Sequence, residues 1–113
     1  MHEMALAQGI LDIVITTAAE HRATKVTSIK LLIGQMIQVE TESLTFGFSA
    51  LSMGTIAEGA QIAIEIIPIS GKCNSCGQQF SVEKYCFICS DCDSTDVLVV
   101  SGRELAVDYL EVE

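Results

Sequence analysis

Residues 73–92 read CNSCGQQFSVEKYCFICSDC and contain all five cysteines of a chain of 113 residues. Cys73 and Cys76 form one CxxC pair, and Cys89 and Cys92 form a second pair after an interval of twelve residues. Two such pairs are typical of a zinc ribbon, in which four thiolates hold one structural Zn²⁺. Because this segment has few apolar residues, metal binding worth about 10 kcal/mol would supply much of its folding free energy.

Cys86 leaves the pairing open, because Cys86 and Cys89 also form a CxxC motif. We favour Cys89 with Cys92, since Ser90-Asp91 are turn residues whereas Phe87-Ile88 would suit a strand. Cys86 is then expected to be a small buried residue outside the metal site. A thiol redox protein is a rival interpretation, but two CxxC pairs in one segment resemble a closed structural site more than a redox motif.

Both flanks of the cysteine-rich segment carry the patterns of an α+β fold. A helix is expected from residue 4 to about residue 22, because apolar residues recur there at steps of three and four. These residues are Ala7, Ile10, Leu11, Val14, Ile15 and Ala18. A second helix, capped by Thr41 or Ser43, should end near Gly54. Strands are expected over residues 26–33, 61–68 and 103–113, and the second of them should have at least one fully buried face.

The economical arrangement inserts the cysteine-rich segment between two strands of one sheet. Residues 1–70 together with 103–113 would form one domain, and residues 71–102 would form a zinc-ribbon domain. A chain of this length suits one small domain with an appendage. No apolar run approaches the roughly 18 residues of a membrane span, and no secretory signal is recognisable. We therefore expect a cytoplasmic protein without membrane insertion.

The charge balance and the absence of catalytic motifs exclude several classes of function. The formal net charge is −9, so a phosphate backbone would be repelled and nucleic-acid binding is not expected. The sequence has no recognisable Ser/His/Asp set and no glycine-rich phosphate loop. A zinc ion held by four thiolates keeps no open position for a substrate. Enzyme activity is therefore not expected.

The chain starts with Met1-His2-Glu3, which places an imidazole and a carboxylate beside the α-amino group. The backbone amine of Met1 and the amide and imidazole nitrogens of His2 can close fused chelate rings around one cation, and Glu3 could add an oxygen. Nitrogen-rich sites with backbone donors favour square-planar geometry, which suits Ni(II) and Cu(II) better than Zn(II). The alternative is an arbitrary, solvated N-terminus.

Taken together, these motifs resemble the HypA family of hydrogenase nickel-incorporation proteins along essentially the whole chain. The resemblance is carried by the Met-His-Glu start, by the two CxxC pairs, and by residues 39–44 (VETESL), 57–60 (AEGA) and 101–105 (SGREL). It implies a nickel-binding domain, in which two helices pack on a small mixed sheet, with an inserted zinc ribbon.

The resemblance also implies a metallochaperone that binds Ni(II) and delivers it to the large-subunit precursor of a [NiFe]-hydrogenase, together with the nucleotide-hydrolysing partner HypB. By motif, nickel falls on His2 and Glu3, with Glu40 as a further candidate ahead of the second helix. Zinc falls on Cys73, Cys76, Cys89 and Cys92. The sequence departs from the family pattern in having Ser90, where a proline is common, and in the additional Cys86. The alternative function is a zinc-ribbon protein-interaction module with no labile metal site.

Overall fold

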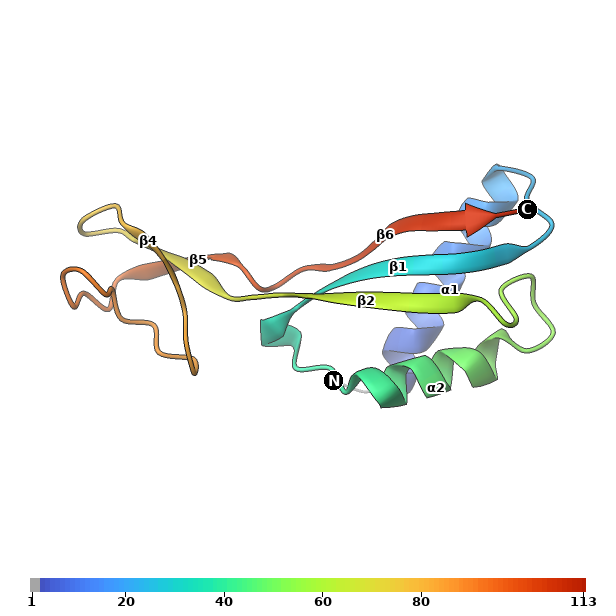
Figure 1. Cartoon of the computed structure of the whole chain (residues 1–113), viewed down its shortest axis with the longest axis horizontal. Helices are drawn as coiled ribbons and strands as arrows, with labels where there is room; N and C mark the ends of the chain where they lie inside the picture. Colours follow the sequence, from blue (N-terminus) through green and yellow to red (C-terminus); the bar gives the residue numbers. More distant parts are fainter. Residues whose placement is uncertain (1–2) are drawn as a thin grey trace.

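The computed structural model describes residues 3–113, so the predicted nickel ligands Met1 and His2 lie outside the described residues. The molecule is elongated, with extents of 54 × 26 × 17 Å. Two three-stranded sheets lie end to end along its length, and both helices belong to one half (Figure 1). This arrangement confirms the expected α+β class.

The larger half is a mixed sheet with strand order β2-β1-β6. β1 (Val26–Gly34) lies in the centre, parallel to β2 (Gln61–Ile67) and antiparallel to β6 (Leu105–Val112). The helix α2 (Thr41–Ser52) connects β1 to β2, since parallel neighbours need a crossover connection of this kind. A short 3₁₀ helix, Gln35–Ile37, links β1 to α2.

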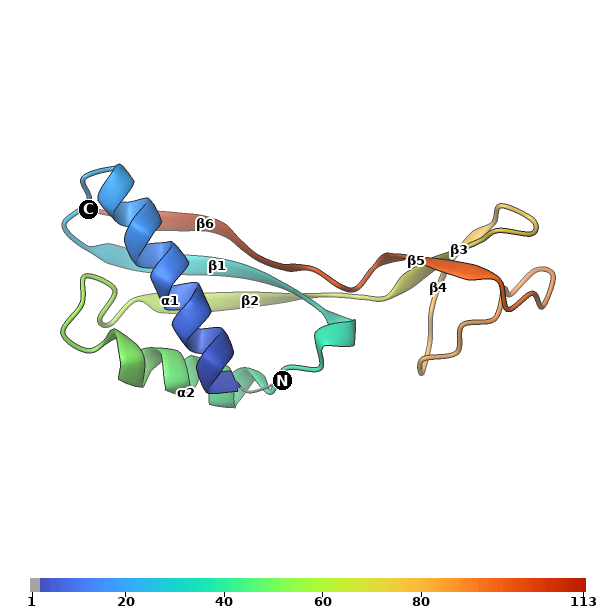
Figure 2. The ribbon, with the colours of Figure 1, turned by 180° about the vertical axis from the view of Figure 1, so that it is seen from behind.

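The helix α1 (Glu3–Glu20) crosses one face of this sheet obliquely, and α2 lies on the same side (Figure 2). The predicted apolar stripe of α1 is buried at Ala7, Ile10, Leu11, Val14 and Ala18. The core is completed by buried side chains of β1 and α2, namely Val26, Ile29, Leu31, Ile33, Leu44 and Phe48. Full burial of such a side chain stabilises the fold by roughly 1.5–3 kcal/mol. No helix among residues 3–113 is long and apolar enough to span a membrane.

Gly9 lies in the interior of α1, where a glycine costs a helix about 1 kcal/mol relative to alanine. Close packing does not account for it, because a Cβ atom on Gly9 would meet no atom within 4 Å. Gly47 of α2 differs, since a Cβ atom there would lie 2.6 Å from the sulfur of Met4. Gly47 therefore faces the Met4 side chain of α1, whereas Gly9 borders open space.

Two local expectations were wrong. β2 has no fully buried face: its residues alternate between half-buried and exposed, because the strand lies at an edge of the sheet. Neither Thr41 nor Ser43 caps α2. The cap is Glu40, whose carboxylate accepts a hydrogen bond of 3.1 Å from the backbone N–H of Glu42.

The second sheet contains the cysteine-rich segment and has strand order β4-β3-β5. β3 (Ser70–Cys73) is antiparallel to both β4 (Gln79–Ser81) and β5 (Val97–Ser101). β2 leads into β3, and β5 leads into β6 (Figure 1). The cysteine-rich segment thus leaves the first sheet after one edge strand and returns to it through the other.

The two sheets meet where Gly34 ends β1. A Cβ atom on Gly34 would lie 2.1 Å from the carbonyl carbon and oxygen of Gly102, so the two backbones are in direct contact. The N–H of Met36 donates to the Gly102 carbonyl at 2.8 Å, and the N–H of Ile69 donates to Gln35 Oε1 at 3.1 Å. The junction is therefore a backbone contact with no room for a side chain at Gly34.

Candidate functional site

The four cysteines predicted as zinc ligands, Cys73, Cys76, Cys89 and Cys92, meet at one point. Their sulfur atoms all lie within 4.8 Å of one another, and the Cys73–Cys92 and Cys76–Cys89 sulfur pairs are 3.6 Å apart. Sulfurs at about 2.3 Å from a tetrahedral zinc ion would be about 3.8 Å apart, whereas a disulfide bond measures about 2.05 Å. The spacing therefore fits a four-thiolate metal site and excludes disulfides between these pairs.

Two turns with the same hydrogen bonds hold these sulfurs in place. The N–H of Cys73 donates to the Gln78 carbonyl at 2.8 Å, and the N–H of Gly77 donates back to the Cys73 carbonyl at 2.8 Å.

The second turn repeats this pattern. The N–H of Cys89 donates to the Ser94 carbonyl at 2.9 Å, and the N–H of Asp93 donates back to the Cys89 carbonyl at 3.0 Å. Gly77 and Asp93, the fourth residues after Cys73 and Cys89, both have a left-handed backbone, with φ of 80° and 61°.

The sulfurs also perturb one another electrostatically. The pKa of Cys73 is lowered to about 6, chiefly by a hydrogen bond from the backbone N–H of Cys76. The pKa of Cys92 is raised to about 12, and that of Cys76 is raised as well. For both Cys76 and Cys92, a hydrogen bond from the backbone N–H two residues later lowers the pKa. A neighbouring thiol, Cys89 for Cys76 and Cys73 for Cys92, raises the pKa together with desolvation, and these effects are larger in sum. Four ionised thiolates therefore need a bound cation to balance their charge.

Cys86 is exposed and lies outside the four-sulfur cluster, so the expectation that it is buried was wrong. The space beside β3 is filled by other side chains: a Cβ atom on Gly71 would contact Val97, Phe80 and Val82. Cys86 instead lies in the loop that follows β4, where its N–H donates to the Glu83 carbonyl at 2.9 Å. The preferred pairing of Cys89 with Cys92 is the one that brings four sulfurs together.

The N-terminal candidate centre is described from Glu3 onward. Glu3 begins α1 at the end that lies beside the start of α2 (Figure 2). Together with Met4, Glu42, Ser43 and Phe46, it lines an open cleft of about 550 Å³. Glu40 is absent from this lining, because its carboxylate caps α2. Glu42, which lies in the first turn of α2, was not among the predicted nickel ligands.

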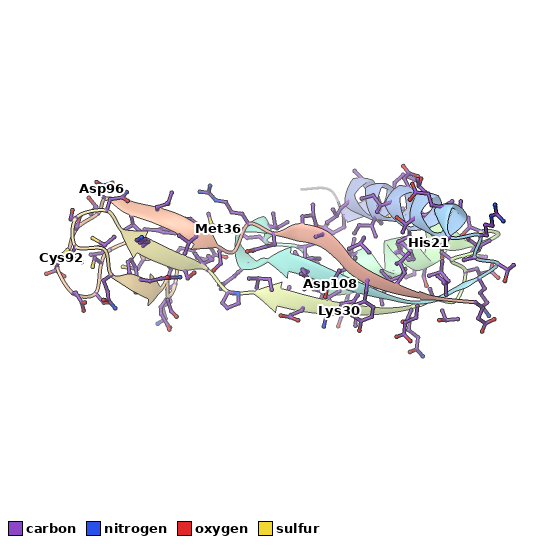
Figure 3. The ribbon with its side chains drawn as sticks, turned by 90° about the horizontal axis from the view of Figure 1, so that it is seen from above. His21, Lys30, Met36, Cys92, Asp96 and Asp108 are labelled. Atoms are coloured by element: carbon purple, nitrogen blue, oxygen red, sulfur yellow. The ribbon has the colours of Figure 1, made fainter. Side chains whose placement is uncertain are left out.

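The two candidate centres lie in different parts of the molecule. Figure 3 shows Cys92 at one end of its length, with His21 and α1 towards the other. No residue of the four-cysteine cluster lines the cleft beside Glu3. The two centres therefore share no ligand among the described residues.

Comparison with known proteins gives one consistent family. Residues 1–112 match the family described as hydrogenase/urease nickel incorporation, metallochaperone, HypA. The hydrogenase maturation factor HypA of Desulfitobacterium hafniense is 39% identical over 113 residues, which cover 100% of this chain and 99% of that protein. The protein of the same name from Chlorobaculum tepidum is 42% identical over 113 residues, with 100% of both chains covered.

The fold is similar to solved structures of the same family. A solution structure of a HypA protein aligns with a TM-score of 0.76 and 20% identity, covering 100% of this chain and 97% of that one. The solution structure of the Ni metallochaperone HypA from Helicobacter pylori aligns with a TM-score of 0.71 and 18% identity, covering 99% and 97%. These are maturation factors and metallochaperones, which do not form a family of catalytic enzymes. This chain belongs to the HypA family of hydrogenase and urease nickel-incorporation metallochaperones.

Proposed function

We propose that this protein binds Ni(II) at its N-terminus and delivers it to the large-subunit precursor of a [NiFe]-hydrogenase, in cooperation with a HypB-type nucleotide-hydrolysing protein. Family membership over residues 1–112 is the observation that carries this proposal. Zn²⁺ held by the four cysteines organises residues 71–102 as a zinc-ribbon domain, and residues 1–70 with 103–113 form the nickel-binding domain. We place this activity in the cytoplasm, because all five cysteines are free thiols.

The proposed nickel donors are the backbone amine of Met1, the amide and imidazole nitrogens of His2, and the carboxylate of Glu3. Because His2 precedes Glu3 directly, a cation held by His2 would lie within reach of the cleft that Glu3 and Glu42 line. One carboxylate oxygen of Glu40 already accepts a hydrogen bond as the cap of α2. Glu42 is therefore the better placed of the two for an additional oxygen contact, although Glu40 was the candidate chosen from sequence.

Nickel binding should depend on His2 and on an unextended N-terminus. Replacing His2 by alanine, or adding Gly-Ser ahead of Met1, removes nitrogen donors and should weaken Ni(II) binding by more than about 100-fold, beyond the effect of losing an outer-shell partner. Isothermal titration of Ni(II) into the zinc-loaded protein measures this. Equal Ni(II) affinity in the native protein and His2→Ala would exclude the N-terminal site and favour the zinc-ribbon interaction module.

Two glutamine variants separate the carboxylate candidates within the same titration. Glu42→Gln should weaken Ni(II) binding by about 10-fold, the usual scale for a supporting ligand, while Glu40→Gln should change it less than about threefold. Both variants remove one negative charge, so a general electrostatic effect would appear equally in the two. A larger loss in Glu40→Gln would return the role to Glu40.

Zinc binding by the four cysteines should weaken steeply in acid. The thiols of Cys76 and Cys92 have raised pKa values, so at neutral pH each must release a proton when the metal binds. The apparent Zn²⁺ affinity should therefore fall by at least about 100-fold per pH unit, and more steeply below pH 6, where Cys73 is also protonated. Competition with a chromogenic chelator between pH 5 and pH 8 tests this, and a slope below one proton per metal would contradict the four-thiolate site.

A further inference from the structure

An apolar groove runs between α1 and β6, and none of its lining residues is a proposed metal ligand. Two adjoining hollows of about 210 Å³ and about 400 Å³ form it, and Ile13 and Val107 line both. Gly9 and Leu105 lie at one end of this α1–β6 groove, and Val112 lies at the other. Ile13 is 53% exposed despite its apolar side chain. The groove therefore presents aliphatic surface that the described chain leaves uncovered.

The groove lies beside an unpaired strand edge. β6 pairs with β1 on one side, and none of residues 3–113 forms a strand on its other side. Leu105, Tyr109 and Val112 on this strand are 44%, 52% and 43% exposed. Exposed edge strands are commonly protected by lysine, proline, a β-bulge or a covering segment. β6 contains no lysine or proline, and Asp108 is the only one of its residues that the register shifts against β1 leave unpaired. An added strand would find free backbone donors and acceptors together with an adjacent apolar groove.

Gly9 indicates that the groove is kept open. It lies on the groove side of α1, a Cβ atom there would meet nothing within 4 Å, and its φ is not positive. Neither close packing nor an unusual backbone conformation therefore requires a glycine at this helical position. The consequence of the missing side chain is space in the groove for an outside group.

The charges beside the groove identify its occupant. Asp108 of β6, labelled in Figure 3, lines the groove, whereas the Glu111 carboxylate lies outside the lining and accepts a hydrogen bond of 2.8 Å from the Ser28 hydroxyl. His21 and Tyr109 are the other titratable residues of the lining, and Arg103 is the only lysine or arginine between residues 97 and 113. A second copy of the chain would bring its own Asp108 to this edge, and like charges directly opposite one another on paired strands are destabilising. A basic partner segment would instead be attracted.

We propose that an extended segment of a partner protein, with alternating aliphatic and basic residues, adds as a fourth strand to β6 and places its aliphatic side chains in the α1–β6 groove. Strand addition to an exposed sheet edge draws affinity from main-chain hydrogen bonds and specificity from pockets for alternate side chains. None of the four cysteines lines the groove, so a bound segment leaves the zinc ligands accessible.

The proposal is tested with a fluorescently labelled, amide-capped octapeptide of alternating valine and lysine, titrated into the metal-loaded full chain. Gly9→Leu should fill the groove and weaken binding at least tenfold. Ala19→Leu adds a leucine at an exposed position of α1 outside the groove. The affinity of this variant for the peptide should therefore stay within twofold of that of the native protein. Neither substitution alters the net charge. Circular dichroism establishes that both variants remain folded.

A second peptide with the same charge, N-methylated on alternate backbone nitrogens, should bind at least tenfold more weakly, because it cannot complete the strand pairing. Equal binding of this peptide would overturn strand addition. Equal binding by Gly9→Leu and Ala19→Leu would overturn the groove as the site and leave only charge attraction. Absence of binding to the native protein, or a dimer in sedimentation that Gly9→Leu abolishes, would overturn the basic partner segment as the occupant.

Discussion

Replacing Cys89 by serine is expected to abolish metal binding at the four-cysteine cluster and to unfold residues 70–101, while the first sheet and its helices stay folded. Cys89 is fully buried within the cluster, and structural zinc supplies about 10–16 kcal/mol to small modules of this kind. Ile69, Gly71 and Val82 are among the few buried residues available to hold this half together without the metal.

The first sheet should survive because its hydrophobic core contains no residue of the cysteine-rich segment. Elemental analysis would then show loss of one zinc per chain. Amide resonances of residues 70–101 would collapse to unfolded positions in a two-dimensional NMR spectrum, while those of α1 and β1 would remain dispersed.

Cys86→Ser is the matched control, because it makes the same substitution three residues away. Cys86 is exposed and lies outside the cluster, so this variant should retain one zinc and a native spectrum. If Cys86→Ser lost zinc while Cys92→Ser kept it, the ligand set would be the other CxxC register. The pair of variants therefore tests which thiols bind the metal as well as whether metal holds the fold.

The elements that sequence predicted well are those with a strong repeating pattern. The apolar stripe of α1 and the aliphatic run of β1 both became core, because each needs a partner surface to bury it. The pairing of Cys89 with Cys92 also followed from local chemistry. The turn residues between these two cysteines allow the second turn to repeat the hydrogen bonds of the first.

The features that sequence missed depend on neighbours distant in the chain. The alternating isoleucines of β2 suggested a buried strand, but its position at the edge of the sheet leaves them half-exposed. Cys86 was expected to be buried, yet it lies exposed in the loop that follows β4. The cleft that joins Glu3 to Glu42 arises only when α1 packs against α2. None of these outcomes is encoded in a local pattern.

The junction between the two sheets is another such feature, and it gives the second large effect. Gly34→Ala should destabilise the protein by at least about 3 kcal/mol, at the upper end of overpacking effects. The added Cβ atom would lie 2.1 Å from backbone atoms of Gly102, which cannot rotate away as a side chain could. The φ angle of Gly34 is −68°, which alanine adopts freely, so the loss is steric and owes nothing to backbone strain.

Gly9→Ala is the matched control for this prediction, because it makes the same change where a Cβ atom meets nothing within 4 Å. It should stabilise the protein by about 0.5–1 kcal/mol through helix propensity alone. Urea denaturation of the zinc-loaded chain, followed by circular dichroism, compares the two. Opposite signs are expected, since one glycine separates two backbones and the other borders open space. Equal stability of Gly34→Ala and the native chain would mean that the junction yields, and that the two sheets are not held in fixed register by Gly34 and Gly102.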